Sequence, residues 1–354
     1  MIGAAGKKLG VTCVFLDPAD SPPAETVGTV IRKPFDDATA LQELARDCDV
    51  ISYEFENVPV AALQAIADAV PVYPPLAALQ QAQDRAHEKA LFEELEIPLP
   101  RWQNVDSVAD LQGAADHVGL PLVLKTRRFG YDGKGQVVVS SRAELPEAFA
   151  ALPKRPLIAE QWIAFDREIS AIGVRNRKGD LATYPLTQNE HRHGILHTSI
   201  APVENAMLAA LAEDYLSRLL LQLDYVGVLA LELFVVGDTL LANEFAPRVH
   251  NSGHWTIEGA TTSQFENHLR AVLDLPLGAT TPTGHAGMIN LIGTMPADPT
   301  ALCAGGAALH DYGKVPRRGR KLGHVTVIAA DGATRDHQLA MLAEKLGDTD
   351  PRPD

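Results

Sequence analysis

The segment from Lys125 to Gln136 constrains this chain more than any other, because it joins a strand that ends in lysine to a loop with closely spaced glycines. Residues 120–124 are apolar and predict a buried strand, and residues 137–139 predict the next one. The loop backbone can approach phosphate oxygens closely at its three glycines, which are Gly130, Gly133 and Gly135. With the charges of Lys125 and Lys134, the pattern predicts a loop that holds a nucleoside triphosphate.

A second interpretation of the same segment is a hairpin whose glycines satisfy turn geometry and whose lysines lie in water, since short glycine motifs match many unrelated sequences. The segment is not a Walker loop, because no Gly-Lys-Ser/Thr opens a helix here, and it lacks the dinucleotide-binding fingerprint. A nucleotide bound here would therefore be held by a loop of another kind.

Length and composition exclude several classes of protein. The chain of 354 residues is long enough for two or three domains, and its 46% hydrophobic and 21% charged residues are ordinary for a globular protein. The formal net charge of -14 argues against a nucleic-acid partner, which requires a basic face. No apolar stretch approaches the ~18 residues that span a bilayer, and no leader is visible, so a cytoplasmic protein without a membrane partner is expected. The three cysteines, Cys13, Cys48 and Cys303, are too widely spaced to indicate a disulfide framework or a zinc site.

Strand and helix signals alternate through the first hundred residues, which favours a parallel sheet covered by helices. The expected strands are residues 11–16, 50–53 and 70–73, and the expected helices are residues 37–45, 60–69 and 80–95. The chain opens directly into what resembles the end of a helix at residues 4–9, closed by Gly10, so a preceding strand is expected to be missing. Pro98 and Pro100 then mark a linker.

Two further units follow the linker. From residue 102 to about residue 165 the expected order is helix, strand, glycine loop, strand, helix (143–151) and strand (157–162), which predicts a small lid around the loop. The longest strands begin near Glu168. The predicted domains are therefore residues 1–100, 101–167 and 168–354, in a chain of the α/β class.

Two glutamates lie on the arms of a predicted hairpin. Residues 226–236 form a nearly uninterrupted apolar strand that contains Glu232, and a Gly-Asp turn leads into residues 239–245, which contain Glu244. A two-residue turn places Asn243 opposite Glu232, whereas a three-residue turn places Glu244 there. Two converging carboxylates would suit magnesium. The alternative is a salt bridge for Glu232 and a solvated strand end for Glu244.

A polar run follows the second strand directly and contains Arg248, His250, Asn251 and His254. Such a density of donors at the end of a sheet favours an anionic substrate. Arg248 stands one short turn beyond a predicted metal carboxylate, where a guanidinium can stabilise charge on a transferring phosphoryl or carboxyl group. Either histidine could instead simply cap the loop.

A basic segment near the end of the chain packs five cationic residues into the eight positions 314–321. One interpretation is a solvated basic turn. The other is a phosphate clamp for a second substrate, whose donors would be Arg317, Arg320 and Lys321.

The chain resembles the ATP-grasp ligases in the order of four features along the sequence. These are the lysine strand, the glycine loop, the Glu-Gln-Trp-Ile hinge and the two-carboxylate hairpin. Within them, the chain is similar to the N5-carboxyaminoimidazole ribonucleotide synthetase family, over essentially its whole length. The motifs that carry this resemblance are Gln83-Asp-Arg with Glu88-Lys89, Phe129-Gly-Tyr-Asp-Gly-Lys-Gly-Gln136, Tyr184-Pro-Leu with His191, Asn243-Glu-Phe-Ala-Pro-Arg-Val-His-Asn-Ser-Gly-His-Trp255 and Gly319-Arg-Lys-Leu-Gly-His324.

The resemblance implies a fold of three domains: a Rossmann-like N-terminal domain, a small lid and a C-terminal mixed-sheet domain. It also implies roles for individual residues. ATP would be contacted by Arg85, Lys125, Gly130, Tyr131, Asp132, Gly133, Lys134, Gly135, Gln136, Glu160, Gln161, Trp162, Ile163, Glu168, His191, Asn243 and Glu244. Glu168 would bind the ribose hydroxyls and the hinge backbone the adenine edge. Glu232 and Glu244 would hold Mg²⁺, with Mn²⁺ as an alternative ion.

The second substrate would be aminoimidazole ribonucleotide, according to the same resemblance. Tyr131, Arg248, His250 and Lys321 would act catalytically around the ribonucleotide and the carboxyl group derived from bicarbonate, while Asn251, Arg317 and Arg320 would help to bind the ribonucleotide and its phosphate. ATP would phosphorylate bicarbonate to carboxyphosphate, and the ribonucleotide amine would attack this intermediate or the carbon dioxide it releases. A homodimer is expected.

Two other functions remain open from the sequence. One is a different ATP-grasp ligase, such as a formate-dependent glycinamide ribonucleotide transformylase or a biotin carboxylase, and the other is an inactive nucleotide-binding module. The sequence departs from the family in two ways. Similar proteins begin with a strand and a Gly-Gly-Gly-Gln-Leu-Gly loop ahead of the first helix, and many superfamily members have Asn where this chain has Ala246.

Overall fold

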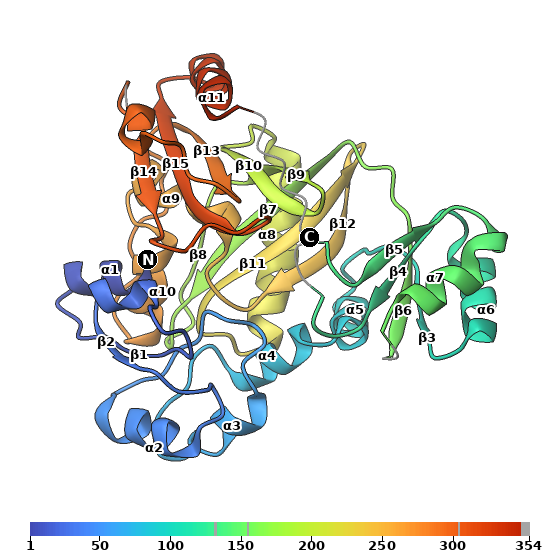
Figure 1. Ribbon diagram of the computed structural model, residues 1–354, viewed down its shortest axis with the longest axis horizontal. Coiled ribbons are helices and arrows are strands. Elements are labelled where there is room, and N and C mark those ends of the chain that lie inside the picture. Colours follow the sequence, from blue (N-terminus) through green and yellow to red (C-terminus); the bar gives the residue numbers. More distant parts are fainter. Residues whose placement is uncertain (131–132, 154–155, 304, 348–354) are drawn as a thin grey trace.

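Three β-sheets organise the chain in a computed structural model, which describes residues 1–130, 133–153, 156–303 and 305–347. One sheet has two strands, one has four and one has nine. Figure 1 shows the four-stranded sheet standing to one side of the nine-stranded sheet, with the first helices and the two-stranded sheet on another side. We refer to the four-stranded sheet as the small sheet and to the nine-stranded sheet as the large sheet.

The first hundred residues contain little sheet. Their elements are α1 (Ile2–Lys8), β1 (Val14–Leu16), β2 (Thr29–Ile31), α2 (Ala38–Asp47), α3 (Val60–Gln64), α4 (Leu76–Ala82) and α5 (Arg85–Glu94). β1, within the strand expected at residues 11–16, pairs in parallel with β2, a strand that the sequence did not predict. The strands expected at 50–53 and 70–73 are reduced to a single parallel bridge between Ile51 and Val72, and the helix expected at 60–69 is shorter.

The prediction of one continuous helix over residues 80–95 is wrong, because the helix is interrupted at Asp84. Asp84 is extended, with φ of -132°, and its side chain accepts a hydrogen bond from the Ala86 amide and so caps α5. The same carboxylate is bound by Arg127, 43 residues later in the chain. A tertiary ion pair therefore favours two short helices over one long one.

The small sheet has the strand order β3-β6-β4-β5 and is antiparallel throughout. Its elements are β3 (Trp102–Val105), α6 (Val108–Val118), β4 (Leu122–Thr126), β5 (Gln136–Val139), α7 (Leu145–Ala151) and β6 (Leu157–Gln161). The sequence did not predict β3, an edge strand of mixed polarity that pairs only with β6 in the described residues. α6 and α7 pack on this sheet around their own apolar cluster, so the unit has a core of its own.

The large sheet has the order β12-β11-β7-β9-β10-β13-β15-β14, with β8 beside β7. Its strands are β7 (Arg167–Arg175), β8 (Leu181–Thr183), β9 (Thr187–Arg192), β10 (Ile195–Ala201), β11 (Gly227–Val236), β12 (Thr239–Ala246), β13 (His285–Ile292), β14 (Ala308–Asp311) and β15 (Lys321–Ala329). Every pair in the described part of this sheet is antiparallel, so the mixed sheet expected here is instead an antiparallel one.

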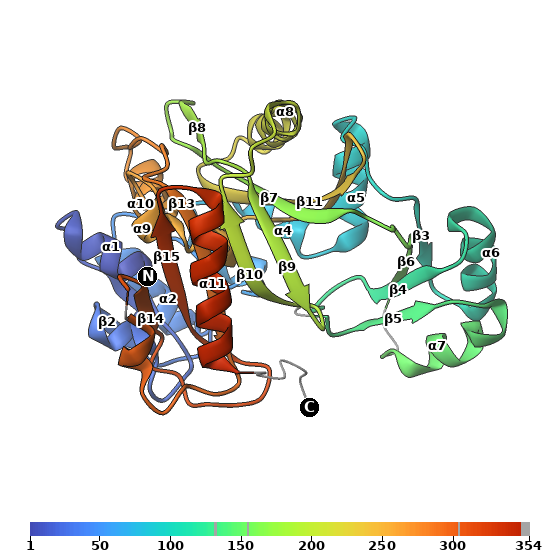
Figure 2. The same ribbon diagram turned by 90° about the horizontal axis from the view of Figure 1, so that it is seen from above.

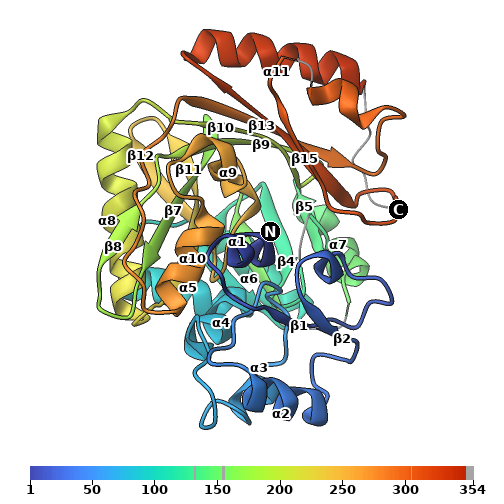
Figure 3. The same ribbon diagram turned by 90° about the vertical axis from the view of Figure 1, so that its left-hand side faces the viewer.

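Helices cover both faces of the large sheet. They are α8 (Ala206–Gln222), α9 (Thr256–Gly259), α10 (Gln264–Val272) and α11 (Gly332–Leu346). Figure 3 shows α8 on one side of β7 and β11, with α10 and α1 on the other. α11 lies along β13 and β15 (Figure 2).

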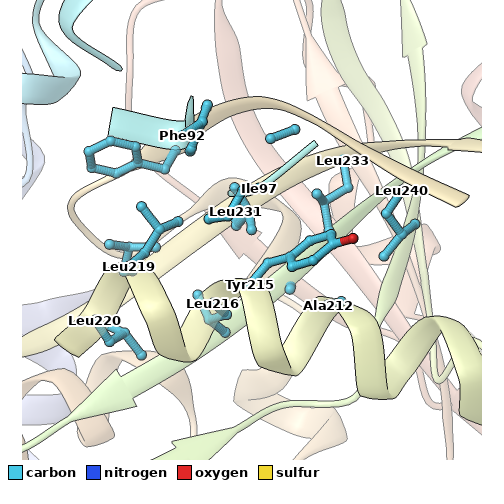
Figure 4. Close-up of a cluster of buried hydrophobic side chains, with 14 of the residues drawn as sticks. Phe92, Ile97, Ala212, Tyr215, Leu216, Leu219, Leu220, Leu231, Leu233 and Leu240 are labelled. Atoms are coloured by element: carbon cyan, nitrogen blue, oxygen red, sulfur yellow. The ribbon is translucent and has the colours of Figure 1, made fainter. Parts of the chain in front are cut away.

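The largest apolar cluster joins α8 to β11, β12 and the end of α5. Figure 4 shows Leu216, Leu219 and Leu220 of α8 packed near Leu231 of β11, with Phe92 closing the cluster. Their spacing along α8 places them on one face of the helix. Phe92 is fully buried in this cluster, so α5 is anchored to the large sheet. Within the described residues, no helix is long and apolar enough to cross a membrane.

Candidate active site

A β-bulge brings Glu232 and Glu244 opposite each other on β11 and β12. Next to the turn, Val236 pairs with Thr239 and Leu233 with Ala242, so the turn has two residues. The register then shifts, and Glu232 pairs with Glu244 while Asn243 is the extra residue. The sequence left two registers open, and the bulge explains why the two-residue turn still gives the glutamate pair. Directly opposed side chains share one face of a sheet, so both carboxylates lie on the same side.

Two buried residues of α5 hold this bulge. The Lys89 ammonium donates a hydrogen bond of 2.5 Å to the Asn243 carbonyl, and the Phe245 amide donates one of 2.7 Å to Glu88 Oε1. The two bonds lie on either side of Glu244. Burial raises the pKa of Glu88 to about 8, so this carboxyl group is largely protonated at neutral pH.

Each carboxylate of the pair has a cationic or basic partner. His250 Nε2 lies 3.0 Å from Glu232 Oε1, and Arg85 Nη1 lies 2.7 Å from Glu244 Oε2. Burial would raise the pKa of Glu232, but the hydrogen bond from His250 and the nearby positive charges lower it to about 2. Glu232 is therefore an ionised, hard oxygen donor at neutral pH, of the kind that Mg²⁺ prefers. The described part of the chain contains no cluster of three or more His, Cys, Asp or Glu side chains arranged to hold a metal ion. The carboxylate pair would therefore supply two protein ligands.

Two lysines converge on Glu160 of β6, Lys125 from β4 of the small sheet and Lys89 from α5. Lys125 Nζ donates to Glu160 Oε2 at 2.9 Å, and Lys89 Nζ lies 3.5 Å from the same oxygen. Burial would raise the pKa of Glu160, but Lys125, Lys89 and Arg85 together lower it to about 2. Burial lowers the pKa of Lys125, and the Glu160 charge opposes that change. The structure therefore brings together Arg85, Lys125 and Glu160, which the sequence placed at the ATP site.

The glycine loop, residues 127–135, requires glycine at specific positions. Gly133 and Gly135 have φ of 74° and 73°, a conformation that other residues rarely adopt. A Cβ at Gly135 would also meet Thr126 Oγ1 at 2.7 Å, and one at Gly130 would lie 3.7 Å from Arg85 Nη2. The loop thus folds back onto β4 and approaches Arg85. Tyr131 and Asp132, both predicted site residues, lie outside the described residues.

Glu168 and His191 meet across neighbouring strands. His191 Nδ1 lies 2.6 Å from Glu168 Oε2, where β7 pairs with β9. Burial would lower the pKa of His191, but the hydrogen bond to Glu168 and the charges of Glu232 and Glu168 raise it. Beyond β6, the Trp162 side chain is 46% exposed and its amide donates to the Pro121 carbonyl at 3.3 Å.

A cavity of about 1630 Å³ lies between the first part of the chain and the segments that flank β12, β14 and β15. A single small-molecule site typically measures roughly 300–1,000 Å³. The polar wall of the 1630 Å³ cavity includes Arg248, Asn251, His254, Tyr312, Lys314 and Lys321. Arg317 and Arg320 do not line this cavity, and their predicted role in phosphate binding stays a prediction.

Hydrogen bonds fix the polar wall of the cavity. Asn251 and Asn290 exchange amide hydrogen bonds of 3.1 and 2.8 Å, which ties the segment after β12 to β13. The Tyr312 hydroxyl lies 3.1 Å from His254 Nδ1 and 2.7 Å from His324 Nδ1. Burial lowers the pKa of His254 well below its usual value, so this histidine is neutral.

Comparisons with known proteins agree with this geometry. Three family models match consecutive parts of the chain: a ribonucleotide synthetase preATP-grasp domain at residues 1–83, an ATP-grasp domain at 90–265 and a phosphoribosylaminoimidazole carboxylase C-terminal domain at 286–338. A Pseudomonas aeruginosa protein named N5-carboxyaminoimidazole ribonucleotide synthase is 48% identical over 340 residues, which cover 96% of this chain and 94% of that protein. This chain belongs to the N5-carboxyaminoimidazole ribonucleotide synthase family.

Solved structures of N5-carboxyaminoimidazole ribonucleotide synthases superpose on the whole chain. The Thermus thermophilus enzyme has a TM-score of 0.94 and 48% identity, and covers 98% of this chain and 96% of its own. The Aspergillus clavatus enzyme in complex with ADP and 5-aminoimidazole ribonucleotide has a TM-score of 0.89 and 30% identity, and covers 98% of this chain and 95% of its own. The ATP-grasp fold and the family resemblance predicted from the motifs are thereby confirmed.

Sequence reasoning missed three residues that the structure places in this synthase site. Glu56 Oε1 lies 2.8 Å from Arg248 Nη2, Asp84 binds Arg127, and Lys89 supports the bulge. Asp84 and Lys89 stood in motifs without an assigned role. Glu56 carried one signal: it is the second of two glutamates, spaced two apart, that directly follow the region predicted as a strand at 50–53.

Proposed function

We propose that this chain catalyses the ATP- and bicarbonate-dependent carboxylation of 5-aminoimidazole ribonucleotide to N5-carboxyaminoimidazole ribonucleotide, with release of ADP and phosphate. One observation carries the proposal. The short segment after β12 serves both parts of the site, because His250 binds Glu232 of the carboxylate pair while Arg248 and Asn251 line the cavity. A phosphoryl group held at the pair would therefore lie next to a molecule held in the cavity.

The two substrates are assigned from the relatives and the geometry together. The names and titles of the relatives give the reaction product, ADP or ATP, and 5-aminoimidazole ribonucleotide. ATP fits the region between the small and large sheets. Lys125 lies on β4 and the Glu168–His191 pair on β7 and β9, and the glycine loop approaches the turn between β9 and β10, because a Cβ at Gly133 would lie 3.0 Å from the His193 carbonyl oxygen. The ribonucleotide fits the cavity, where Lys314 and Lys321 offer cations to its phosphate. The roles predicted for Tyr131, Asp132, Arg317 and Arg320 remain part of the proposal.

Magnesium fits the carboxylate pair. Glu232 and Glu244 are opposed across β11 and β12, and Mg²⁺ commonly takes one or two carboxylates together with substrate phosphates. These two residues would hold the ion, with Asn243 beside them at the bulge. When bound, the ion would neutralise charge on the triphosphate. Glu232 is ionised at neutral pH without it, because His250 already lowers the pKa of its carboxyl group.

The proposed reaction needs no nucleophile from the protein. A bicarbonate oxygen attacks the γ-phosphorus of ATP, the bond to the β-phosphate oxygen breaks, and carboxyphosphate and ADP result. The ribonucleotide amine then attacks the carboxyl carbon, or the carbon dioxide released from carboxyphosphate, and phosphate leaves. Lys125 and Arg248 would stabilise charge on the transferred groups, and closure of the small sheet would exclude water from the labile intermediate.

Three further features remain part of the proposal. The domain boundaries at residues 100 and 167 and a cytoplasmic location are predicted from the sequence, and a homodimer is implied by the family resemblance. α5 belongs to the first predicted domain, yet its Phe92 packs in the same cluster as α8 and β11. The boundary at residue 100 therefore separates units that share a core, and limited proteolysis near the Pro98–Pro100 linker would test it.

The deciding experiment measures phosphate release from ATP in the presence of magnesium, with bicarbonate and 5-aminoimidazole ribonucleotide omitted in turn, together with carboxylated product. We expect strong release only with the ribonucleotide present, and one product for each phosphate. Release stimulated by glycinamide ribonucleotide and formate, or by biotin, would favour a different ATP-grasp ligase. Binding of both ATP and the ribonucleotide by the folded protein without turnover would favour an inactive nucleotide-binding module.

A further inference from the structure

Three consecutive residues at the junction of α4 and α5 bind three different parts of the molecule. Asp84 accepts two hydrogen bonds of 2.8 Å from Arg127, at the start of the glycine loop. Arg85 reaches Glu244 of the carboxylate pair at 2.7 Å. Gln83 precedes these two residues in the sequence and binds a third set of partners. The tripeptide is therefore a junction between the small sheet, the large sheet and the first part of the chain.

The Gln83 side chain joins the glycine loop to the segment at residues 56–58. Its Nε2 donates to the Glu56 carbonyl at 2.9 Å and to the Val58 carbonyl at 2.8 Å. Its Oε1 accepts from Arg128 Nη2 at 2.8 Å. These partners fix the orientation of the amide, because only nitrogen can donate to carbonyls and only oxygen can accept from a guanidinium. Both amide hydrogens are used on one segment and the amide oxygen on the other.

The segment at residues 56–58 leads directly to the cavity. The Glu56 side chain binds Arg248 at 2.8 Å, and Arg248 lines the cavity wall. Arg248 Nη1 also donates to the Val249 carbonyl at 2.9 Å, so the guanidinium is held on two sides. A continuous series of hydrogen bonds thus runs from Arg128 in the glycine loop through Gln83 and the Glu56 backbone to Arg248.

We propose that Gln83 is a positioning residue that couples the glycine loop to Arg248. The inference rests on the proposed function, in which the loop covers ATP and Arg248 faces the carboxyl group that is transferred. With Gln83 in place, the loop position and the orientation of Arg248 are linked, so the intermediate forms only where the amine can reach it. Without the amide, residues 56–58 lose two hydrogen bonds and Arg248 loses a fixed partner. Carboxyphosphate is then lost to water, while ATP is still bound and cleaved.

The test compares product formed with phosphate released, for wild type, Gln83→Ala and Gln83→Glu. Gln80→Ala is the matched control, because Gln80 is an exposed glutamine on α4. We expect a ratio near one for wild type and the control, and a ratio below about one half for both Gln83 variants. ADP affinity, measured by calorimetry, should stay within about threefold of wild type. Gln83→Glu keeps the acceptor for Arg128 but cannot donate to the two carbonyls.

Each outcome decides something different. If the wild-type protein formed no ribonucleotide-dependent product, the proposed function itself would be contradicted. A coupled wild type together with a ratio near one in Gln83→Ala or Gln83→Glu would overturn the role of Gln83. If Gln83→Ala does not fold, Arg128→Ala removes the other end of the same link and should also uncouple. A folded Arg128→Ala that remains fully coupled would contradict the inference. The double variant should uncouple no further than either single variant, because both act through one link.

Discussion

The two glutamates of the carboxylate pair differ in their surroundings, although they face each other across one strand pair. Glu232 is bound by a histidine and its side chain is 15% exposed, whereas Glu244 is bound by Arg85 and its side chain is 40% exposed. Arg85 is also within the set of cations that lower the pKa of Glu160. Loss of the charge on Glu244 should therefore alter the chemistry of the site more than the stability of the fold.

For Glu244→Gln, we expect ADP binding to persist and magnesium-dependent turnover to fall by about 100-fold or more, because one of the two carboxyl side chains that would hold the ion is lost. Turnover and nucleotide affinity would be measured over a range of magnesium concentrations. Glu266→Gln is the matched control, since Glu266 also pairs with an arginine but lies on α10. Near-normal turnover in Glu244→Gln would refute the metal assignment.

His268 links the first part of the chain to the large sheet and should make stability depend on pH. Its Nδ1 accepts from the Val228 amide at 3.2 Å, and its Nε2 lies 2.8 Å from Ser52 Oγ. Burial lowers the pKa of His268 to about 4. On acidification, His268 therefore takes up a proton at a lower pH in the folded state than in the unfolded state, where the histidine pKa is about 6.5.

The sign follows from linkage: this contribution is fully present above pH ~6.5 and is lost as pH falls toward 4. Between pH 7 and pH 5, wild type should lose about 2 kcal/mol of unfolding free energy through this residue. His268→Gln should be less stable at pH 7 but should lose less on acidification. Denaturant unfolding at both pH values measures the difference, and equal losses in the two proteins would show that His268 does not titrate as inferred.

At the scale of elements, the bulge in β12 depends on α5, a helix about 150 residues earlier in the chain. Glu88 and Lys89 bind the backbone on either side of Glu244, and both side chains are buried. Glu88 needs only a carbonyl-type oxygen for its bond to the Phe245 amide. Its charge is not needed for that contact, and burial disfavours the charge.

Glu88→Gln should therefore stabilise the fold at alkaline pH. Because the pKa of Glu88 is raised to about 8, its contribution to stability is fully present below pH ~4.5 and is lost as pH rises through 8. Glutamine keeps the acceptor oxygen and cannot ionise, so we expect a gain of at least about 1 kcal/mol at pH 8 and a smaller one at pH 5. Unfolding curves at the two pH values test this, and a variant that is less stable at pH 8 would contradict it.

The elements also show where sequence reasoning succeeded and where it stopped. The hairpin of β11 and β12 was predictable because its apolar run and its Gly-Asp turn are local signals. Its bulge was not, because Lys89 and Glu88 come from a distant helix. β3 was missed because its strand character rests on pairing with β6, and the break at Asp84 because it depends on Arg127. Nonlocal contacts decided each of these features.

At the scale of the whole molecule, two binding regions meet at one short segment. Lys125 and Glu160 lie on β4 and β6, the central strands of the small sheet, whereas Lys314 and Lys321 lie on the cavity wall between the first part of the chain and the end of the large sheet. The residues between them are the carboxylate pair, His250 and Arg248. A cation in one region should therefore affect one substrate and leave the other unchanged.

This separation predicts that replacing each of two lysines weakens the binding of a different substrate. Lys314 lies 5.2 Å from the Tyr312 ring centroid on the cavity wall, and Lys314→Met should raise the KM for 5-aminoimidazole ribonucleotide by about tenfold with little change in the KM for ATP, because a phosphate contact is lost. Lys125→Met should weaken ATP binding and slow turnover, with little change in ribonucleotide affinity. Steady-state kinetics with each substrate varied in turn, and Lys178→Met as an exposed control, would measure both effects. If Lys314→Met raised the KM for ATP instead, the ribonucleotide would not occupy this cavity as proposed.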